Sequence, residues 1–290
     1  MIEGDVETAV RAARSWMYTP GTKPELFESA ARNGADAVIL DLEESVLPAD
    51  KAAARNIVIE HVTTAARDDV VTSVRINSAS TAAGLADLTA LISADVAPDV
   101  LVLPKMESAG ALGVIENLLF EASSRTMLVP LIETARGVRD LPRILASQHR
   151  VVAVLVGAAD LAANLGAAGD WESLQSVRSS IVLAAGAVDV VAIDAPFFET
   201  GDQLGLAEET NRAARLGFSA KAVIHPKQVS AINTAFAPTE DQLTWANRVM
   251  SVYAAGGGEL EGETVDDAVA HRARRYLRRS KSVDTLTPTT

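Results

Sequence analysis

Leu128-Val-Pro-Leu-Ile-Glu-Thr134 is the stretch that decides the fold, and Val154-Leu-Val-Gly-Ala-Ala-Asp160 repeats its pattern further along the chain. Each is an apolar run, too short for a helix, that ends at a carboxylate. Such runs are typical of strands buried on both faces of a parallel sheet covered by helices. Glu133 and Asp160 lie 27 residues apart, which is the length of one strand–helix–strand repeat. The pattern therefore predicts two neighbouring parallel strands whose carboxyl ends meet.

The two terminal carboxylates have a chemical consequence. Neighbouring strands lie about 5 Å apart, so the two acids would repel each other and one would stay protonated unless a cation lay between them. Oxygen ligands without nearby Cys favour Mg²⁺ or Mn²⁺ over zinc, and the chain has no Cys at all. We therefore expect Glu133 and Asp160 to bind a divalent metal at the carboxyl ends of parallel strands.

The bulk composition narrows the class of protein. A length of 290 residues suits an α/β barrel, and a hydrophobic content of 48% supplies an ample core. The net charge of −12 argues against a nucleic-acid partner. No apolar stretch approaches the roughly 18 residues of a membrane helix, and the acidic N-terminus has no signal-peptide pattern. Together with the lack of Cys, these features predict a cytoplasmic protein without membrane spans.

Short apolar runs alternate with helical patterns along most of the chain. This alternation predicts a closed (β/α)₈ TIM barrel, because a doubly wound open sheet usually has fewer strands and a Gly-rich first turn. Here the first turn has only Pro20-Gly21. The predicted strands are 14–18, 37–42, 70–76, 100–105, 127–132, 151–157, 188–194 and 222–224.

The chain beyond the barrel has a different character. We expect residues 1–240 to form the catalytic barrel, 241–279 a C-terminal helical arm or lid, and 280–290 a disordered tail. Within the arm, the Gly-rich stretch 254–263 predicts a flexible hinge before a basic helix at 267–279. A lid, an arm reaching a neighbouring subunit and a frayed terminus all fit this composition.

Polar residues just past the strand ends are the first candidates for catalysis in such a barrel. Arg75 is suited to grip a carboxylate, and a metal beside it suggests an α-keto or hydroxy acid as substrate. Structural interpretations stay open for several others: Asp41 and Asp194 as loop caps or ion-pair members, Glu107 as a helix cap and His225 as a hydrogen-bonding group. The full set is Asp41, Glu43, Glu44, Arg75, Asn77, Lys105, Glu107, Glu133, Asp160, Asp194 and His225.

Motifs along the chain resemble the citrate lyase β-subunit-like branch of the HpcH/HpaI aldolase superfamily, which includes malyl-CoA and citramalyl-CoA lyases. The resemblance covers roughly residues 14–270, and the order and spacing of its motifs are specific. The matching segments are Tyr18-Thr-Pro-Gly21, Gly34–Ser45, Lys51 with Arg55, Val74-Arg-Ile-Asn77, Leu103–Ser108, Leu131–Thr134, Gly157–Leu161, Lys221–Pro226 and Phe236–Pro238.

This resemblance implies a Mg²⁺-dependent carbon–carbon lyase. Such an enzyme cleaves a β-hydroxyacyl-CoA, such as malyl-CoA or citramalyl-CoA, to acetyl-CoA and a 2-keto acid (glyoxylate or pyruvate), or runs the reverse condensation. By the same resemblance Glu133 and Asp160 are metal ligands, Glu133 and Arg75 contact the substrate, and Glu43 and Glu44 line the water shell of the metal. Family members are commonly homotrimers, or hexamers built from trimers.

A second implication concerns the arm. In family members with such an arm, an Asp in a Gly-x-x-Ile-Asp motif acts as acid or base, often in the site of a neighbouring subunit. Gly262-Glu-Thr-Val-Asp266 matches that pattern, which makes Asp266 the candidate. Three positions depart from the family pattern: Ala159 for Glu, the pair Glu43-Glu44 for Glu-Asp, and Ala268 for Pro.

Other activities remain open at this stage. One alternative is thioester hydrolysis of malyl-CoA or a malate-synthase-like reaction, and another is a citrate lyase β subunit that acts on an acyl-carrier protein. A pyruvate aldolase of free aldehydes is disfavoured because that branch has a His in the second strand, and Leu40–Ser45 contains none.

Overall fold

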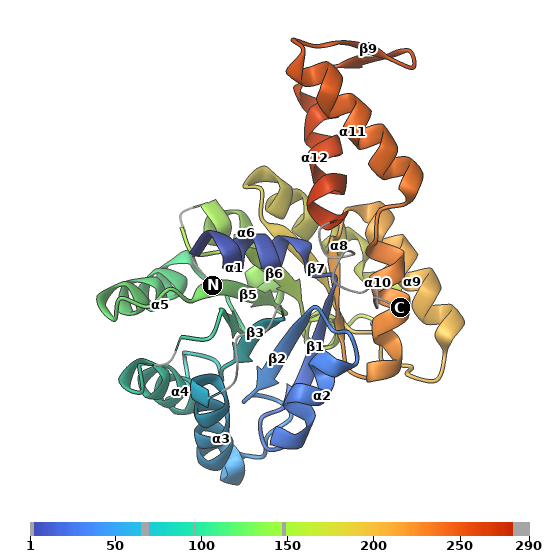
Figure 1. Cartoon of the computed structure of the whole chain (residues 1–290). Coiled ribbons are helices and arrows are strands. Elements are labelled where there is room, and N and C mark those ends of the chain that lie inside the picture. Colours follow the sequence, from blue (N-terminus) through green and yellow to red (C-terminus); the bar gives the residue numbers. More distant parts are fainter. Residues whose placement is uncertain (1–2, 65–69, 96, 147–148, 281–290) are drawn as a thin grey trace, which may run out of the picture.

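The computed structural model describes residues 3–64, 70–95, 97–146 and 149–280. Eight parallel strands close into a barrel in sequential order, as the alternation of apolar runs predicts (Figure 1). The strands are β1 Ser15–Pro20, β2 Ala37–Asp41, β3 Val71–Arg75, β4 Val100–Leu103, β5 Met127–Ile132, β6 Ala153–Val156, β7 Val191–Asp194 and β8 Ala220–Val223.

Helices surround the barrel and extend beyond it. Several begin at a side-chain cap, as where Thr81, Ser108 and Asp170 accept hydrogen bonds from backbone N–H groups of the first turn. The helices are α1 Glu3–Ala12, α2 Phe27–Arg32, α3 Lys51–Thr64, α4 Ala82–Ser93, α5 Ala109–Glu121, α6 Ala135–Ala146, α7 Ala158–Leu165, α8 Trp171–Ala187, α9 Gln203–Leu216, α10 Val229–Phe236, α11 Glu240–Ala254 and α12 Asp267–Ser280.

Alternation along the strands divides the core into two layers. In β5, Val129 and Leu131 belong to the cluster inside the barrel, whereas Leu128 and Ile132 pack in the layer between the barrel and its helices. Every residue of β5 is buried, which explains why its sequence is continuously apolar. The inner cluster also contains residues of α1, so this helix closes the amino end of the barrel.

The C-terminal segment forms an arm, which we define as α11, α12 and the β-hairpin between them. Figure 1 shows the arm projecting from the barrel, with the hairpin at its far end. Arg275 donates to the carbonyl of Gly217 over 3.2 Å, and Arg279 donates to Ser219 over 2.6 Å. Because Gly217 and Ser219 lead into β8, the arm is attached at the amino end of the barrel, opposite the carboxyl ends of the strands.

Two expectations about local structure are wrong. The Gly-rich stretch 254–263 is not a simple hinge, because Gly258–Leu260 (β9) pairs antiparallel with Glu263–Val265 (β10). The segment after β6 is not the polar, Gly-bearing loop up to Gly169 that its composition predicts, because it contains α7. Sequence reading also omits α10.

The predicted tail lies almost wholly outside the described residues, since Ser280 ends α12 and 281–290 are not described. The division into barrel, arm and tail remains our interpretation. Among the described helices, none has the length and apolar character needed to cross a bilayer.

A buried ionic network ties β7 and β8 to α8. Asp194 lies 2.8 Å from Nε of Arg178 and 2.6 Å from Nζ of Lys221, and Lys221 also contacts Glu209 at 2.8 Å. Burial alone would raise the pKa of Asp194, but Lys221 and Arg178 outweigh it and hold that pKa below its usual range. Of the two structural readings of Asp194, the ion-pair reading is therefore confirmed.

Asp194→Asn should lower the free energy of unfolding by about 3–5 kcal/mol, because it leaves buried cations short of a counter-charge. Urea unfolding measures this loss. The contribution should be present above pH 4, roughly the pKa of an unfolded Asp, and should fade as the pH falls towards the lower folded value. The control Glu172→Gln breaks the surface pair with Arg212 and should leave stability nearly unchanged, so equal effects of both variants would contradict the assignment.

Candidate active site

The carboxyl ends of β2 and β3 are joined by an ion pair. The two strands are in register with Asp41 opposite Arg75, and the guanidinium donates from Nε over 2.6 Å and from Nη2 over 2.8 Å to the two carboxylate oxygens. Burial alone would raise the pKa of Asp41, but its hydrogen bonds with Arg75 and the charge of that group hold the pKa below its usual range. The ring of Tyr18 covers the guanidinium at 4.6 Å.

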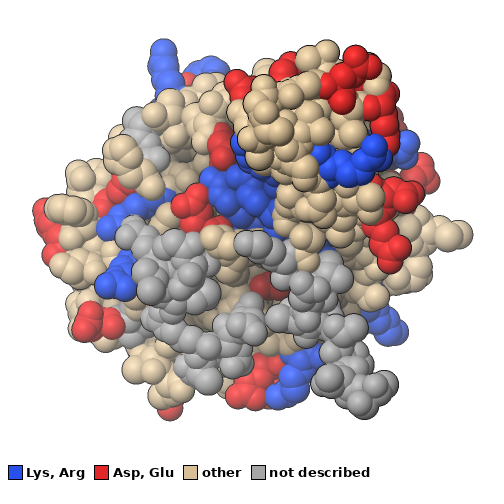
Figure 2. All heavy atoms as spheres, turned by 45° about the horizontal axis from the view of Figure 1, so that its top comes forward, with Lys and Arg blue, Asp and Glu red and all other residues tan. Residues whose placement is uncertain are grey.

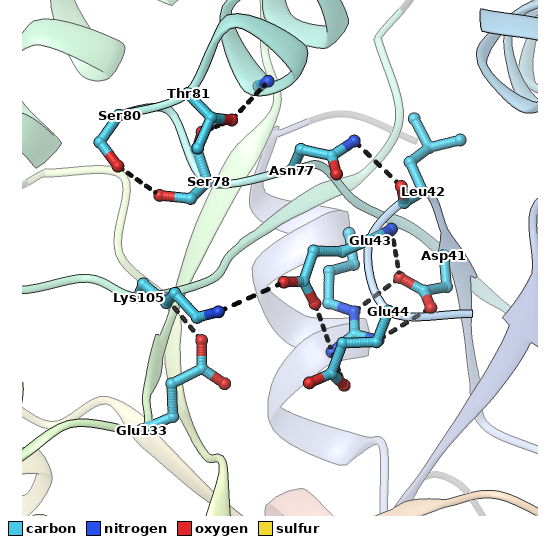
Figure 3. A network of polar contacts seen from close by, with 12 residues as sticks. Asp41, Leu42, Glu43, Glu44, Asn77, Ser78, Ser80, Thr81, Lys105 and Glu133 are labelled. Carbon is cyan, nitrogen blue, oxygen red and sulfur yellow. Dashed lines mark hydrogen bonds and ion pairs between the residues drawn. The ribbon is translucent and has the colours of Figure 1, made fainter. Parts of the chain in front are cut away.

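Asp41 also shapes the loop after β2. Its oxygens accept hydrogen bonds from the backbone N–H groups of Glu43 (2.9 Å) and Ser45 (3.0 Å). The loop therefore presents Glu43 and Glu44 to the third nitrogen of Arg75, Nη1, which lies 3.3 Å from Glu43 and 3.1 Å from Glu44. Figure 3 shows these acids pointing toward Glu133 and Lys105 on the other side of the site.

Arg75 is therefore not the unpaired carboxylate-binding group that the sequence predicts, because Asp41 already binds it. One edge of the guanidinium, formed by Nε and Nη2, is already bound to Asp41. Only Nη1 remains directed toward the acids around the site. The substrate contact of Arg75 stays a prediction, and in this arrangement it would be made from the Nη1 side of the guanidinium.

Glu133 follows β5 and is almost fully buried, with 2% of its surface exposed. It accepts a 2.7 Å hydrogen bond from the backbone N–H of Lys105 just beyond β4, where the backbone takes a left-handed φ of 52°. Burial, helped by the negative charges of Asp160 and Glu43, raises the pKa of Glu133 to about 8 despite the lowering effects of the Lys105 hydrogen bond and the charge of Arg75. A cation would stabilise the ionised form of this carboxyl.

Asp160 reaches the site from the first turn of α7, not from a strand end as the sequence pattern suggests. Gly157 makes the junction between β6 and α7, and a Cβ there would lie 2.5 Å from Cβ of Glu133 and 2.7 Å from its Oε2. Only glycine therefore allows α7 to begin so close to Glu133. Because β5 and β6 pair up to Ile132 and Val156, the two acids come from neighbouring units of the barrel.

A third carboxyl joins this pair. Burial raises the pKa of Glu44, and the hydrogen bond that it shares with Asp160 raises it further. Oxygen donors crowded in this way fit Mg²⁺, which commonly takes one or two protein carboxylates and fills its other positions with water or substrate. Within the described ranges, no cluster of three or more His, Cys, Asp or Glu is arranged to hold a metal. Glu133 and Asp160 therefore stay predicted ligands.

A cavity of about 360 Å³ opens over these groups. Tyr18, Arg75, Glu44, Glu133 and Asp160 line its polar side. Apolar residues form the other side, and among them Phe198 has 55% of its surface accessible. The apolar lining is Leu131, Val156, Ala158, Ala159, Pro196, Phe198 and Ile224. The shape provides a polar centre for chemistry beside a wall for a hydrocarbon chain.

The remaining predicted residues lie apart from this centre. Asn77 bonds to Asp87 and to the carbonyl of Leu42, and Glu107 lies 3.8 Å from Arg136. His225 accepts from the backbone of Lys227, which agrees with a structural role.

Asp266 is exposed and accepts from the backbone N–H of Val269 at the start of α12. It lies 13 residues before Arg279, the contact with the amino end of the barrel, which corresponds to about 20 Å of helix. The arm of the same chain therefore does not bring Asp266 to the cavity.

Sequence reasoning assigns no role to Tyr18 or Gly157. Tyr18 covers Arg75 from β1, and only the register of the barrel reveals this contact. The signal for Gly157 is visible in Val156-Gly157-Ala158, where glycine separates a buried strand from a helix. A glycine at this point is explained by the close approach of Glu133.

Comparison with known proteins agrees with this geometry. The sequence profile of the family described as HpcH/HpaI aldolase/citrate lyase matches residues 14–226. The chain belongs to this family of lyases. A citrate lyase subunit beta-like protein of Mycobacterium tuberculosis is 37% identical, with 93% of this chain and 96% of the relative covered. An L-malyl-CoA/beta-methylmalyl-CoA lyase of Cereibacter sphaeroides is 32% identical, with 88% of each chain covered.

Solved structures match the whole fold. The CitE protein of Mycobacterium tuberculosis, in complex with magnesium, acetoacetate and coenzyme A, has a TM-score of 0.73 and 37% identity over 93% of this chain and 99% of that one. RipC from Yersinia pestis has a TM-score of 0.72 and 41% identity over 81% of this chain and 99% of that one. The TIM-barrel fold and the family membership are thus confirmed.

Gly157→Ala should displace Glu133 and weaken divalent-ion binding at least tenfold, because the added methyl group overlaps the carboxylate. The overlap should also lower stability by about 1–3 kcal/mol. Titration with Mn²⁺ followed by electron paramagnetic resonance, together with thermal unfolding, measures both effects. Gly186→Ala is the matched control, since a Cβ at that helical position meets nothing within 4 Å. Unaltered Mn²⁺ affinity in Gly157→Ala would contradict the placement of the site.

Proposed function

We propose that the protein is a Mg²⁺-dependent lyase that breaks or forms a carbon–carbon bond next to a CoA thioester. The substrate class is a β-hydroxyacyl-CoA such as malyl-CoA or citramalyl-CoA, and the products are acetyl-CoA and glyoxylate or pyruvate. The observation that carries this proposal is the crowding of Glu133, Asp160 and Glu44 in one cavity, with Arg75 beside them. The Mg²⁺, keto acid and coenzyme A bound to the CitE protein of Mycobacterium tuberculosis support it.

Each residue of the site would have a separate role in this reaction. Glu133 and Asp160 would hold the ion, which when bound acts as a Lewis acid toward the substrate oxygens. Mn²⁺ suits the same oxygen donors. Nη1 of Arg75 would contact the keto-acid carboxylate, and Asp41 would keep the guanidinium in place. Glu43 and Glu44 would position water molecules, since Oε2 of Glu43 is buried and makes no hydrogen bond among the described residues, although it lies 3.3 Å from Nη1 of Arg75.

The apolar side of the cavity would receive the acyl chain. Phe198 and Pro196 would exclude water from the thioester side of the site. In the cleavage direction a general base takes the proton of the substrate hydroxyl, the carbon–carbon bond breaks, and the products are the keto acid and a thioester enolate. A general acid must then protonate the enolate carbon to give acetyl-CoA. The acids that line the cavity are Glu133, Asp160 and Glu44 around the proposed metal site and Asp41, which is bound to Arg75, so we assign this step to a group from outside the barrel.

Asp266 is the group that we propose for this proton transfer, supplied by the arm of a second copy. Its distance from the cavity of its own chain supports action between subunits, and therefore a homo-oligomer such as a trimer or hexamer. A cytoplasmic location accords with the absence of Cys.

A second candidate function is hydrolysis of the thioester, as in a malyl-CoA thioesterase or a malate-synthase-like enzyme. Ala159, which is exposed beside Asp160, leaves room for a water molecule where the family pattern has Glu. Action on an acyl-carrier protein is a third possibility, supported by relatives described as citrate lyase subunit beta. A panel of CoA thioesters incubated with Mg²⁺ distinguishes these reactions. Keto acid with acetyl-CoA supports the lyase, free CoA supports hydrolysis, and turnover only with a carrier protein supports the third.

Glu133→Ala and Asp160→Ala should each abolish Mg²⁺ binding and turnover, because one carboxylate alone holds the ion weakly. Chelation of the wild-type protein with EDTA should have the same effect, and added Mg²⁺ should reverse it. Glu107→Ala, which alters a partly exposed acid outside the cavity, is the control. Full turnover after exhaustive chelation would refute the role of the metal.

Arg75→Ala should weaken keto-acid binding by about 2–5 kcal/mol, the range for losing a buried charged partner. Calorimetric titration of glyoxylate and pyruvate in the presence of Mg²⁺ measures this. Arg75→Lys keeps the positive charge but not the planar guanidinium with its several N–H donors. It should therefore recover only part of the affinity. Wild-type affinity in Arg75→Ala would remove this residue from the substrate site.

Asp266→Asn should suppress turnover by at least a hundredfold while metal binding stays intact. Mixing it with Glu133→Ala should restore activity, since mixed oligomers combine an intact arm with an intact barrel site. Asp267→Asn, one residue further along the exposed start of α12, is the control. Normal turnover by Asp266→Asn would exclude the arm from the chemistry, and an inactive mixture would exclude action between subunits.

A further inference from the structure

A second cavity, larger than the first, lies between the arm and the barrel. Its volume is about 930 Å³, and residues of α9, α10, α11 and α12 line it. We call this space the arm cleft. It opens at the amino end of the barrel and is separate from the cavity over Glu133 and Asp160. Figure 2 shows Lys and Arg side chains gathered where the arm meets the barrel.

Four guanidinium groups line the arm cleft, and no Asp or Glu is among its described lining residues. Arg272, Arg275 and Arg279 are spaced three and four residues apart, so they share one face of α12. Arg215 faces them from the last turn of α9. The chain as a whole carries a net charge of −12. Its composition therefore does not explain why four arginines and no acids line this cleft.

The partners of these arginines leave the positive charge largely uncompensated. Arg272 has a carboxylate partner, Glu263 at 2.7 Å. Arg275 and Arg279 donate only to backbone carbonyls and the hydroxyl of Ser219, and Arg215 has no hydrogen bond or ion pair within the described residues. Burial and the neighbouring arginines lower the pKa of Arg279 to about 10, which reflects the missing negative charge.

Attachment of the arm explains part of this arrangement but not all of it. The bonds from Arg275 and Arg279 to the end of α9 fasten α12 to the barrel. Arg215 contributes nothing to that attachment, although it lines the same cavity. The lining also includes apolar groups such as Tyr276 and Pro238 beside the charges.

We propose that the arm cleft is a binding site for a small phosphate-bearing molecule. Guanidinium groups bind phosphate oxygens in pairs of parallel hydrogen bonds, and a multiply charged phosphate would neutralise several of these arginines at once. The apolar lining would take the uncharged part of the ligand. Because the cleft is bounded by both barrel and arm, a bound ligand would also fix their relative position.

The test is calorimetric titration of the full chain with inorganic pyrophosphate and with ADP, in buffer without divalent ions. The wild-type protein should bind at least one of them, and Arg215→Gln should raise the dissociation constant at least tenfold. Arg215 makes no hydrogen bond or ion pair with any other described residue, so this variant should fold normally, as thermal unfolding will verify. Arg275→Gln should weaken binding as well. Arg32→Gln, in an exposed pair with Glu28, is the control and should bind like the wild type.

The two probes distinguish a site for a whole nucleotide from a site for the phosphate groups alone. Tighter binding of ADP assigns the cleft to a nucleotide, whereas equal affinities assign it to the phosphate groups alone. The proposal fails if neither probe binds at millimolar concentration, or if Arg215→Gln and Arg32→Gln weaken binding equally. It also fails if Arg215→Gln changes only the oligomeric mass, since the cleft would then be a contact between copies. None of these outcomes depends on lyase activity.

Discussion

Glu133 is buried beside other carboxylates, and most features of the carboxyl end of this barrel can be understood from that one constraint. An ionised carboxylate removed from water needs a positive partner or several hydrogen bonds, and the surroundings supply a single backbone N–H from Lys105. The nearby cation, Arg75, is itself committed to Asp41. A divalent ion between Glu133 and Asp160 would supply the missing charge.

The barrel supports this arrangement through its own geometry. The left-handed backbone at Lys105 aims its N–H at Glu133, and the glycine at 157 lets α7 begin against the same side chain. The left-handed φ of Lys105 is strained for a residue with a side chain, whereas Gly157 is needed because a Cβ there would overlap Glu133. Strain of this kind at one rim of an otherwise regular barrel accords with a site shaped for binding.

Much of the fold could be predicted because its signals are local. Buried strands flanked by turns are recognisable one at a time, and β5 begins and ends where its apolar run does. Glu133 could be identified in the same way, since it directly follows that run. Helix α7 was missed because Ala158–Leu165 is only eight residues long and begins directly after a strand, with no polar cap.

The pairing of Arg75 could not be predicted from local signals. It depends on the register that places Asp41 opposite Arg75 and on the burial of both groups. Sequence position alone does not distinguish an arginine that is free to bind substrate from one held by a carboxylate. The same limit applies to the arm: its basic helix was expected, but its attachment at the amino end of the barrel depends on contacts between α12 and the segment before β8.

The central claim is that Glu133 and Asp160 bind one divalent ion. The most direct measurement is anomalous X-ray diffraction from crystals of the protein grown with Mn²⁺. The account predicts a single strong anomalous peak within about 2.3 Å of an oxygen of each carboxylate, a distance typical of oxygen ligands to such ions. A peak elsewhere with none between these two side chains, or no peak at millimolar Mn²⁺, would contradict it.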